Sequence, residues 1–417
     1  MKTYKLISAQ VLRATITILI LLTIFSWSKP AQAVNITVTT TNDELNTDGD
    51  CSLREAIQAV NVRAGVDACL AGTGNDVIML PAGMYTLSLA GGNENDNATG
   101  DLDVFPISSL GGTVELQGAG AATTIIDGGG IDRVLSLLRS DSTLIVRNVT
   151  IRNGQLTDQP GAGILSWGAL ELRNVIIENN VVNGTSSSAT GGGFCIGCGP
   201  GTGSGVLEQV IIRNNQADRG GGVFSNRPLT IAASSIISNT ARAGGAIENY
   251  GDLSLVNSTI SGNTATNNIG GIRHYANSLS VLNSTIAYNQ RGGVSASASL
   301  TLKNTIIAYN TGSGWNNCNG SGAVASQGYN LSNDSTCGAW FTASGDLNNV
   351  DPLLGPLQNN GGSTPTHALP LGSPAVNAGT NAGCPATDQR GVSRPQGGRC
   401  DIGAFEVVFL YLPLVLR

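Results

Sequence analysis

The sequence is short of charge, and above all of positive charge. Asp, Glu, Lys and Arg make up 12% of its 417 residues, and beyond residue 33 there is a single lysine, Lys303. An acidic chain of this kind is a poor partner for nucleic acid or an anionic membrane, so we expect neither. Low charge combined with many β-branched residues also argues against disorder and for sheet.

Long apolar runs are missing too, except near the start. A basic beginning, with Lys2 and Lys5, precedes an apolar stretch at 14–25 and the small-x-small sequence Ala31-Gln32-Ala33. This order is typical of a secretory signal peptide, so we expect residues 1–33 to be removed and the protein to be extracellular, either secreted or at the cell surface. Their loss takes four basic residues and no acids, which lowers the net charge from −6 to −10.

We expect no transmembrane helix after the signal. The apolar tail at 407–417 is too short to span a bilayer, and Pro413 interrupts it. No LPxTG-type motif accompanies it. The tail is expected to be a last strand that closes a C-terminal cap, with a short sorting or attachment signal as the alternative.

The eight cysteines all lie beyond residue 33, in four pairs that are close in sequence. An even number in an exported chain argues for disulfides. Cys195-Ile-Gly-Cys198 is a CxxC motif, which also invites a zinc or redox interpretation. No second CxxC or nearby histidine supports zinc, and no βαβ pattern supports a redox site. We therefore expect four disulfides: Cys51–Cys69, Cys195–Cys198, Cys318–Cys337 and Cys384–Cys400.

A repeat runs through the middle of the chain. Segments such as "LELRNVIIENN", "LSLVNSTISGN" and "LTLKNTIIAYN" share the pattern Leu-x-Leu-x-Asn-x-x-Ile-x-x-Asn. The final position recurs every 21 to 35 residues, at Gly154, Asn180, Asn215, Asn239, Asn263, Asn289 and Asn310. Alternation of apolar and polar residues places Leu and Ile on one face of short strands. A period of this length is typical of a solenoid.

A second motif alternates with the first. Pairs or triplets of small residues, such as Gly220 to Gly222 and Gly244-Gly245, precede short apolar runs. Each period therefore carries at least two strands joined by Asn- and Gly-rich turns. We predict an all-β fold, a right-handed parallel β-helix, in which stacked Asn amides form ladders. A leucine-rich repeat is disfavoured because the repeats contain no helical segment.

One helix is expected, at the beginning of the mature chain. In "DGDCSLREAIQAVN", Ser52 and Glu55 match a capping box, and the helix should begin at about Leu53. Apolar residues follow at helical spacing, at Leu53, Ala56, Ile57 and Val60. We interpret this helix as a lid on the open first coil, with Arg54 facing solvent or bonding loops of the cap.

Both ends of the chain resemble known families. "CSLREAI" (51–57) is similar to the motif that names the CSLREA domain of exported bacterial proteins. Residues 351–406, with Asp388-Gln389-Arg390-Gly391, resemble the choice-of-anchor Q domain. Together they resemble the pectin-lyase-like β-helix superfamily. The resemblance implies a CSLREA cap at 34–75, a parallel β-helix at 76–345 and a choice-of-anchor Q region at 346–406, without implying a known reaction.

Catalytic residues are hard to find in the repeats. Polysaccharide lyases on such a fold need a strong base beside acids that bind calcium, and hydrolases need clustered carboxylates. Between 171 and 310 the acids are few and scattered: Glu171, Glu178, Glu208, Asp218, Glu248 and Asp252. Arg273 with His274 is the most reactive-looking pair, and His367 is expected to be structural. A groove that gathered three of these acids with an arginine would favour an enzyme.

Two acidic loops are weak candidates for calcium. Asn46, Asp48 and Asp50 alternate in "NTDGDCS", which resembles half of a calcium loop, and a second loop carries Asp101 and Asp103. Solvated acidic loops are the alternative. We expect no other cofactor.

The positions of three aromatic side chains suggest that the protein binds a ligand. When the Gly-Gly strands are aligned, Trp167, Tyr250 and Tyr275 fall at equivalent positions, with Arg273 close by. In register, these rings could form a partial column for stacking on sugars. We therefore expect a surface-associated adhesin or carbohydrate-binding envelope module, with no catalytic residues assigned and a polysaccharide or the cell envelope as partner. The alternative is a polysaccharide lyase or glycoside hydrolase, and a third possibility is a passive envelope protein.

Overall fold

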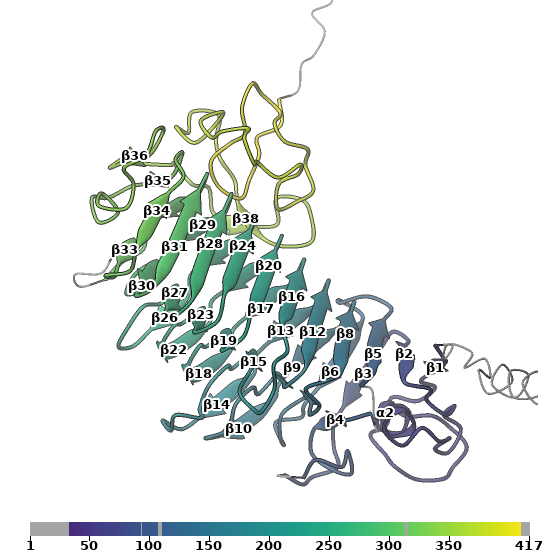
Figure 1. Ribbon diagram of the computed structural model, residues 1–417. Helices are drawn as coiled ribbons and strands as arrows, with labels where there is room; N and C mark the ends of the chain where they lie inside the picture. Colours follow the sequence, from purple (N-terminus) through teal and green to yellow (C-terminus); the bar gives the residue numbers. More distant parts are fainter. Residues whose placement is uncertain (1–32, 93, 107–110, 313–315, 410–417) are drawn as a thin grey trace, which may run out of the picture. The chain divides into compact units, whose positions relative to one another are not determined.

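The computed structural model describes residues 33–92, 94–106, 111–312 and 316–409. The predicted signal peptide and most of the apolar tail lie outside these residues. Val34–Arg417 form one unit, built around stacked coils (Figure 1). No helix within the described ranges is long and apolar enough to cross a membrane.

The coils form four sheets in which all neighbouring strands are parallel. Sheet I carries the Leu-x-Leu segments: β1 (Asn35–Thr37), β2 (Asn75–Leu80), β5 (Thr113–Gly118), β8 (Thr143–Arg147), β12 (Ala169–Arg173), β16 (Gly205–Glu208), β20 (Leu229–Ala232), β24 (Leu253–Val256), β28 (Ser278–Leu282), β31 (Ser299–Lys303) and β34 (Val324–Ser326).

Sheet II carries the Ile segments that follow: β3 (Gly83–Thr86), β6 (Thr124–Asp127), β9 (Thr150–Arg152), β13 (Ile176–Glu178), β17 (Ile211–Arg213), β21 (Ser235–Ile237), β25 (Thr259–Ser261), β29 (Thr285–Ala287), β32 (Ile306–Ala308), β35 (Leu331–Ser332) and β36 (Leu347–Asn348).

Sheet III carries the strands after the glycine pairs: β4 (Leu102–Val104), β7 (Leu135–Leu137), β11 (Ile164–Ser166), β15 (Phe194–Ile196), β19 (Val223–Ser225), β23 (Ile247–Asn249), β27 (Ile272–His274), β30 (Val294–Ala296) and β33 (Cys318–Asn319). The short sheet IV lies between II and III along the chain: β10 (Gln155–Thr157), β14 (Val181–Asn183), β18 (Gln216–Arg219), β22 (Thr240–Ala243) and β26 (Thr264–Ala265). The fold is the predicted right-handed parallel β-helix.

Alternation within each strand builds the core. In β12, Leu170 and Leu172 are buried, and Leu207 of β16 continues the column of Leu172, whereas Glu171 and Arg173 point outward. Because every coil adds such residues, one hydrophobic core runs the length of the solenoid.

The predicted asparagine ladder is confirmed. Each side-chain amide from Asn180 through Asn215, Asn239, Asn263 and Asn289 to Asn310 donates to the next, at 2.8–3.0 Å, and a last bond reaches Asn317. These residues are buried. Left-handed backbone occurs beside the ladder and not at it: in the turn between sheets I and II, at asparagines such as Asn174 (φ 50°), and at the residue before each ladder position, such as Asn179 (φ 56°).

The predicted helix is α2 (Leu53–Val62). Ser52 Oγ accepts from the Glu55 N–H at 3.1 Å and Glu55 Oε2 accepts from the Ser52 N–H at 2.9 Å, which confirms the capping box. Arg54 is fully buried, pairs with Asp43 at 2.7 Å and donates to loop carbonyls, so it bonds the cap and does not face solvent. Sheet I begins within the expected cap, because β1 pairs with β2.

The C-terminal cap has two parts. Trp340 and Phe341 close the end of the main core, beside the Cys318–Cys337 disulfide. The region that follows, with the hairpin β37 (Leu357–Gln358) and β38 (Thr366–His367), lies along the outer face of sheet II (Figure 1). There Ser235 and Thr259 bond to it. All four predicted disulfides are present.

Candidate functional site

Three adjoining cavities form a groove along the outer face of sheet III. Their volumes are about 260, 550 and 410 Å³. Pro160 and Cys198 line both the first and the second, while Ser187 and Arg219 line both the second and the third. The connections from sheet IV to sheet III, including Pro160 and residues 185–188, supply part of the lining, and the turn at 197–199 supplies another part. We call this surface the sheet III groove.

The aromatic residues singled out from the sequence do share one coil position. Strand pairing places Trp167, Gly197, Asn226, Tyr250 and Tyr275 in line, one on each successive coil. Tyr250 and Tyr275 stack, with ring centroids 4.7 Å apart and planes at 10°. Trp167 lines the other end of the groove. Gly197 and Asn226 lie between it and Tyr250, so the column of rings is interrupted.

Phe224, which sequence reasoning missed, fills part of that gap. It lies two residues earlier in the coil, 5.7 Å from the Tyr250 ring. It packs with Leu165 and Cys195 from the neighbouring strands, and Trp167 and Tyr250 flank this cluster. The Cys195–Cys198 disulfide therefore lies at the groove, with Cys198 at its surface.

A buried carboxylate organises the basic end of the groove. Glu248 is fully buried and accepts from Arg219 Nε at 2.9 Å, from Tyr250 Oη at 3.1 Å and from Arg273 at 3.4 Å. Burial and the Glu248 charge raise the pKa of Tyr250. The Arg273 guanidinium lies 4.3 Å from the Tyr275 ring centroid, within range of a cation–π contact.

Arg242 adds a third guanidinium beside the same cavity. It bonds Asp218 through two nitrogens, at 2.8 and 2.9 Å. Of the six repeat acids, Asp218 lines the groove and Glu248 is buried beside it, and both are ion-paired. Glu171 and Glu208 instead form a charge ladder with arginines on sheet I, Glu178 pairs with Arg213 on sheet II, and Asp252 bonds Ser278.

The two histidines lie apart from the groove surface. His274 is buried, on the opposite side of β27 from Arg273, and its Nδ1 lies 3.0 Å from the Asn249 amide. Burial lowers its pKa. His367 contacts Ser261 Oγ at 2.9 Å and the Gly355 carbonyl at 2.7 Å, so it ties the C-terminal region to sheet II. The pair Arg273–His274 is therefore not one reactive site.

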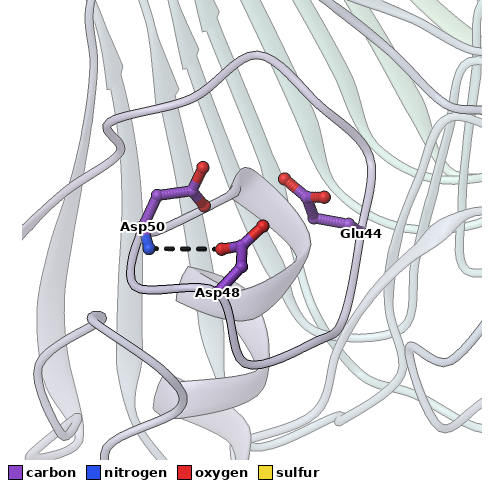
Figure 2. Close-up of side chains that lie close together, drawn as sticks. All are labelled: Glu44, Asp48 and Asp50. Atoms are coloured by element: carbon purple, nitrogen blue, oxygen red, sulfur yellow. Dashed lines mark hydrogen bonds between the residues drawn. The ribbon is translucent and has the colours of Figure 1, made fainter.

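The first acidic loop does bring carboxylates together. Glu44, Asp48 and Asp50 lie within reach of a shared ion, and Figure 2 shows their side chains converging in the loop before α2. Asp50 N–H donates to Asp48 Oδ1 at 3.3 Å. One oxygen each of Glu44 and Asp50 is buried without a partner. Burial, then the charges of Asp48 and Glu44, raise the pKa of Asp50. These residues could hold a hard divalent cation.

The second pair of calcium candidates does not form such a group. Asp101 accepts from Ser136 at 2.5 Å and from Arg133 at 3.0 Å. Asp103 is 1% exposed, and within the described ranges both its carboxyl oxygens lack hydrogen-bond partners. Burial, together with the charges of Asp101 and Glu94, raises the pKa of Asp103 to about 8.

Comparisons with known proteins add little to this description. No family model matches the chain, and no curated protein matches its sequence. The resemblances of residues 51–57 and 351–406 to the CSLREA and choice-of-anchor Q families therefore remain predictions. Among solved structures, the chain is similar to the crystal structure of pectate lyase Pel9A, at 15% identity and a TM-score of 0.42. The alignment covers 91% of this chain and 97% of that one.

Proposed function

We propose that this protein is an exported, surface-associated β-helix that binds a polysaccharide along the sheet III groove without altering it chemically. The observation that carries the proposal is the stacked pair Tyr250–Tyr275, which lies in line with Trp167 beside a continuous groove. Flat apolar ring faces bordered by hydrogen-bonding groups suit sugar rings, which have apolar faces and polar edges.

The ion pairs at the basic end of the groove support binding over catalysis there. A general acid or base must be free to exchange a proton with the substrate. Asp218 is held by Arg242, and Glu248 is held by Arg219 and Tyr250. As hydrogen-bond acceptors, these two carboxylates orient the arginines beside the groove.

The disulfides support export. All eight cysteines lie in four disulfides, and such bonds persist in oxidising compartments outside the cytosol. The placement of the groove on sheet III, away from the C-terminal region on sheet II, leaves that region free for attachment, as its family resemblance implies.

A glycan-array screen of the mature chain tests the proposal, together with Trp167→Ala and Tyr275→Ala. We expect binding to at least one polysaccharide class and a loss of about tenfold in affinity for each variant. Tyr288→Ala is the matched control, because Tyr288 also belongs to a stacked tyrosine pair, with Tyr309, outside the groove. Failure to bind any glycan would refute the proposal. Release of unsaturated uronate or reducing ends, with or without calcium, would favour the enzyme alternative.

A further inference from the structure

The smallest cavity of the groove has a lining of two unlike kinds. Leu138, Leu165 and Trp167 provide an apolar part, and Glu94, Asp101 and Asp132 provide carboxylates. Its volume of about 260 Å³ suits a single small ring. Because Pro160 and Cys198 also line the neighbouring cavity, a chain lying in the groove reaches it.

Negative charge is in excess here. Arg133 faces the three carboxylates as the one basic residue in this lining, and it is committed to Asp101 and Ser136. Glu94 accepts three backbone N–H groups, from Asp96, Ala98 and Thr99. Asp132 is 8% exposed; its Oδ1 accepts from the Arg133 N–H at 2.8 Å.

A fourth carboxyl group, that of Asp103, is affected by this excess of negative charge. Asp103 is 1% exposed, and its two carboxyl oxygens have no hydrogen-bond partner among the residues that the structure describes. After burial itself, the charges of Asp101 and Glu94 are what raise its pKa, to about 8. Burial and Asp101 also raise the pKa of Asp132. Buried carboxylates that outnumber their cationic partners are stabilised by a bound cation.

The residues that line this cavity favour an organic cation over a metal ion. Within the described ranges, carboxylates close enough to share a metal ion occur at 44–67, and the carboxylates of this cavity are not among them. A metal ion with its hydration shell would also make no use of the apolar part of the lining, which Leu138, Leu165 and Trp167 provide. A cationic group on a carbon framework uses both parts of the lining, since the ring face attracts positive charge and the carboxylates pair with it.

We infer that this cavity takes a sugar unit carrying a protonated amino group, so that the groove selects amino-sugar polymers. This inference rests on the proposed polysaccharide binding and adds the chemical class of the ligand. Asp132 is the central specificity residue, because it lines the cavity and, within the described ranges, its carboxylate accepts from the Arg133 N–H and from no side chain.

Two oligosaccharides that differ only at the nitrogen test the inference. The mature chain is titrated calorimetrically with hexamers of glucosamine and of N-acetylglucosamine, at neutral pH and low ionic strength. We expect the glucosamine hexamer to bind about tenfold more tightly, as a charged hydrogen bond in a buried site provides. Asp132→Asn should abolish this preference. Trp167→Ala should weaken both hexamers.

Glu208→Gln is the matched control, since it removes one negative charge from the outer face of sheet I. It should keep the full preference, and unfolding midpoints verify that every variant folds. Equal binding of both hexamers would overturn the inference while leaving polysaccharide binding intact, as would an equal loss of preference in Glu208→Gln. Binding of neither hexamer would also overturn it, and the glycan array would then decide the proposed function separately.

Discussion

Arg219 and Glu248, 29 residues apart in the chain, form an ion pair at the basic end of the sheet III groove, with the carboxylate fully buried. The same carboxylate accepts from Tyr250, so it holds the aromatic and basic parts of the groove in place. Removing it would leave two partly buried guanidinium groups without their shared partner.

Glu248→Ala should therefore lower the free energy of unfolding by about 2 kcal/mol, since a buried pair that loses one member leaves an uncompensated charge. It should also weaken glycan binding. Chemical denaturation measures the first effect. Glu208→Ala is the control: that pair with Arg173 is 44% and 42% exposed, so its loss should change stability by less than about 0.5 kcal/mol. Equal effects of the two substitutions would contradict this account.

The asparagine ladder should be sensitive to a single deletion. Asn239 donates to Asn263 and to the Ile212 carbonyl, and accepts from the backbone and side chain of Asn215. Asn239→Ala leaves these buried groups unpaired, which should cost about 3 kcal/mol. Asn267→Ala, at an exposed site, should be nearly neutral. The midpoints of urea unfolding compare the two, and a neutral Asn239→Ala would show that the ladder adds no stability.

The raised pKa of Asp103 predicts an unusual dependence of folding stability on pH. Its pKa is about 8 in the folded protein against an ordinary 3.8, so the folded state binds the proton more tightly and stability falls as pH rises between these values. Asp103→Asn removes this loss. Its thermal midpoint should match the native protein near pH 4 and exceed it near pH 8.

Asp252 provides a control in which the change of stability with pH has the opposite sign. Hydrogen bonds from Ser278 lower the pKa of Asp252, so its carboxylate stabilises the fold above the ordinary pKa. Asp252→Asn should lower the thermal midpoint at pH 8 and leave it unchanged well below pH 4. An Asp103→Asn variant with the same shift at both pH values would mean that Asp103 is not protonated in the folded protein.

The carboxylates Glu44, Asp48 and Asp50 predict a response to calcium. Without a cation they repel one another, so Asp48→Asn should raise the thermal midpoint in the presence of a chelator. Millimolar calcium should raise the midpoint of the native protein by a few degrees and that of Asp48→Asn by less. Differential scanning calorimetry compares the four conditions. A native midpoint that calcium leaves unchanged would assign the loop to solvated acids.

Local patterns in the sequence predicted the solenoid well. Leu-x-Leu alternation and the recurring asparagine define coils that stack in register, as Leu170 and Asn180 show. The capping box at Ser52 and the four close cysteine pairs are likewise short-range signals, and each matches the structure.

The sheet III groove could not be predicted in this way, because no local sequence pattern shows which segments come together in it. Coil lengths vary from 21 to 35 residues, so the pairing of Arg219 with Glu248 follows from a loop length and not from the repeat. Asp101 and Asp132 precede the recognisable repeats, and their convergence depends on loops held by buried residues such as Arg54. The C-terminal region lies along sheet II through small polar contacts, such as Thr259 to Gln389, which carry no sequence signature.

Hydrogen–deuterium exchange with a retained polysaccharide tests the central claim most directly, because it locates the bound chain on the fold. The account predicts slower exchange in the segments that line the sheet III groove, at 159–160, 185–190 and 197–199, with little change over the outer faces of sheets I and II. Protection confined to sheet I or to the C-terminal region, with the groove segments unchanged, would contradict it.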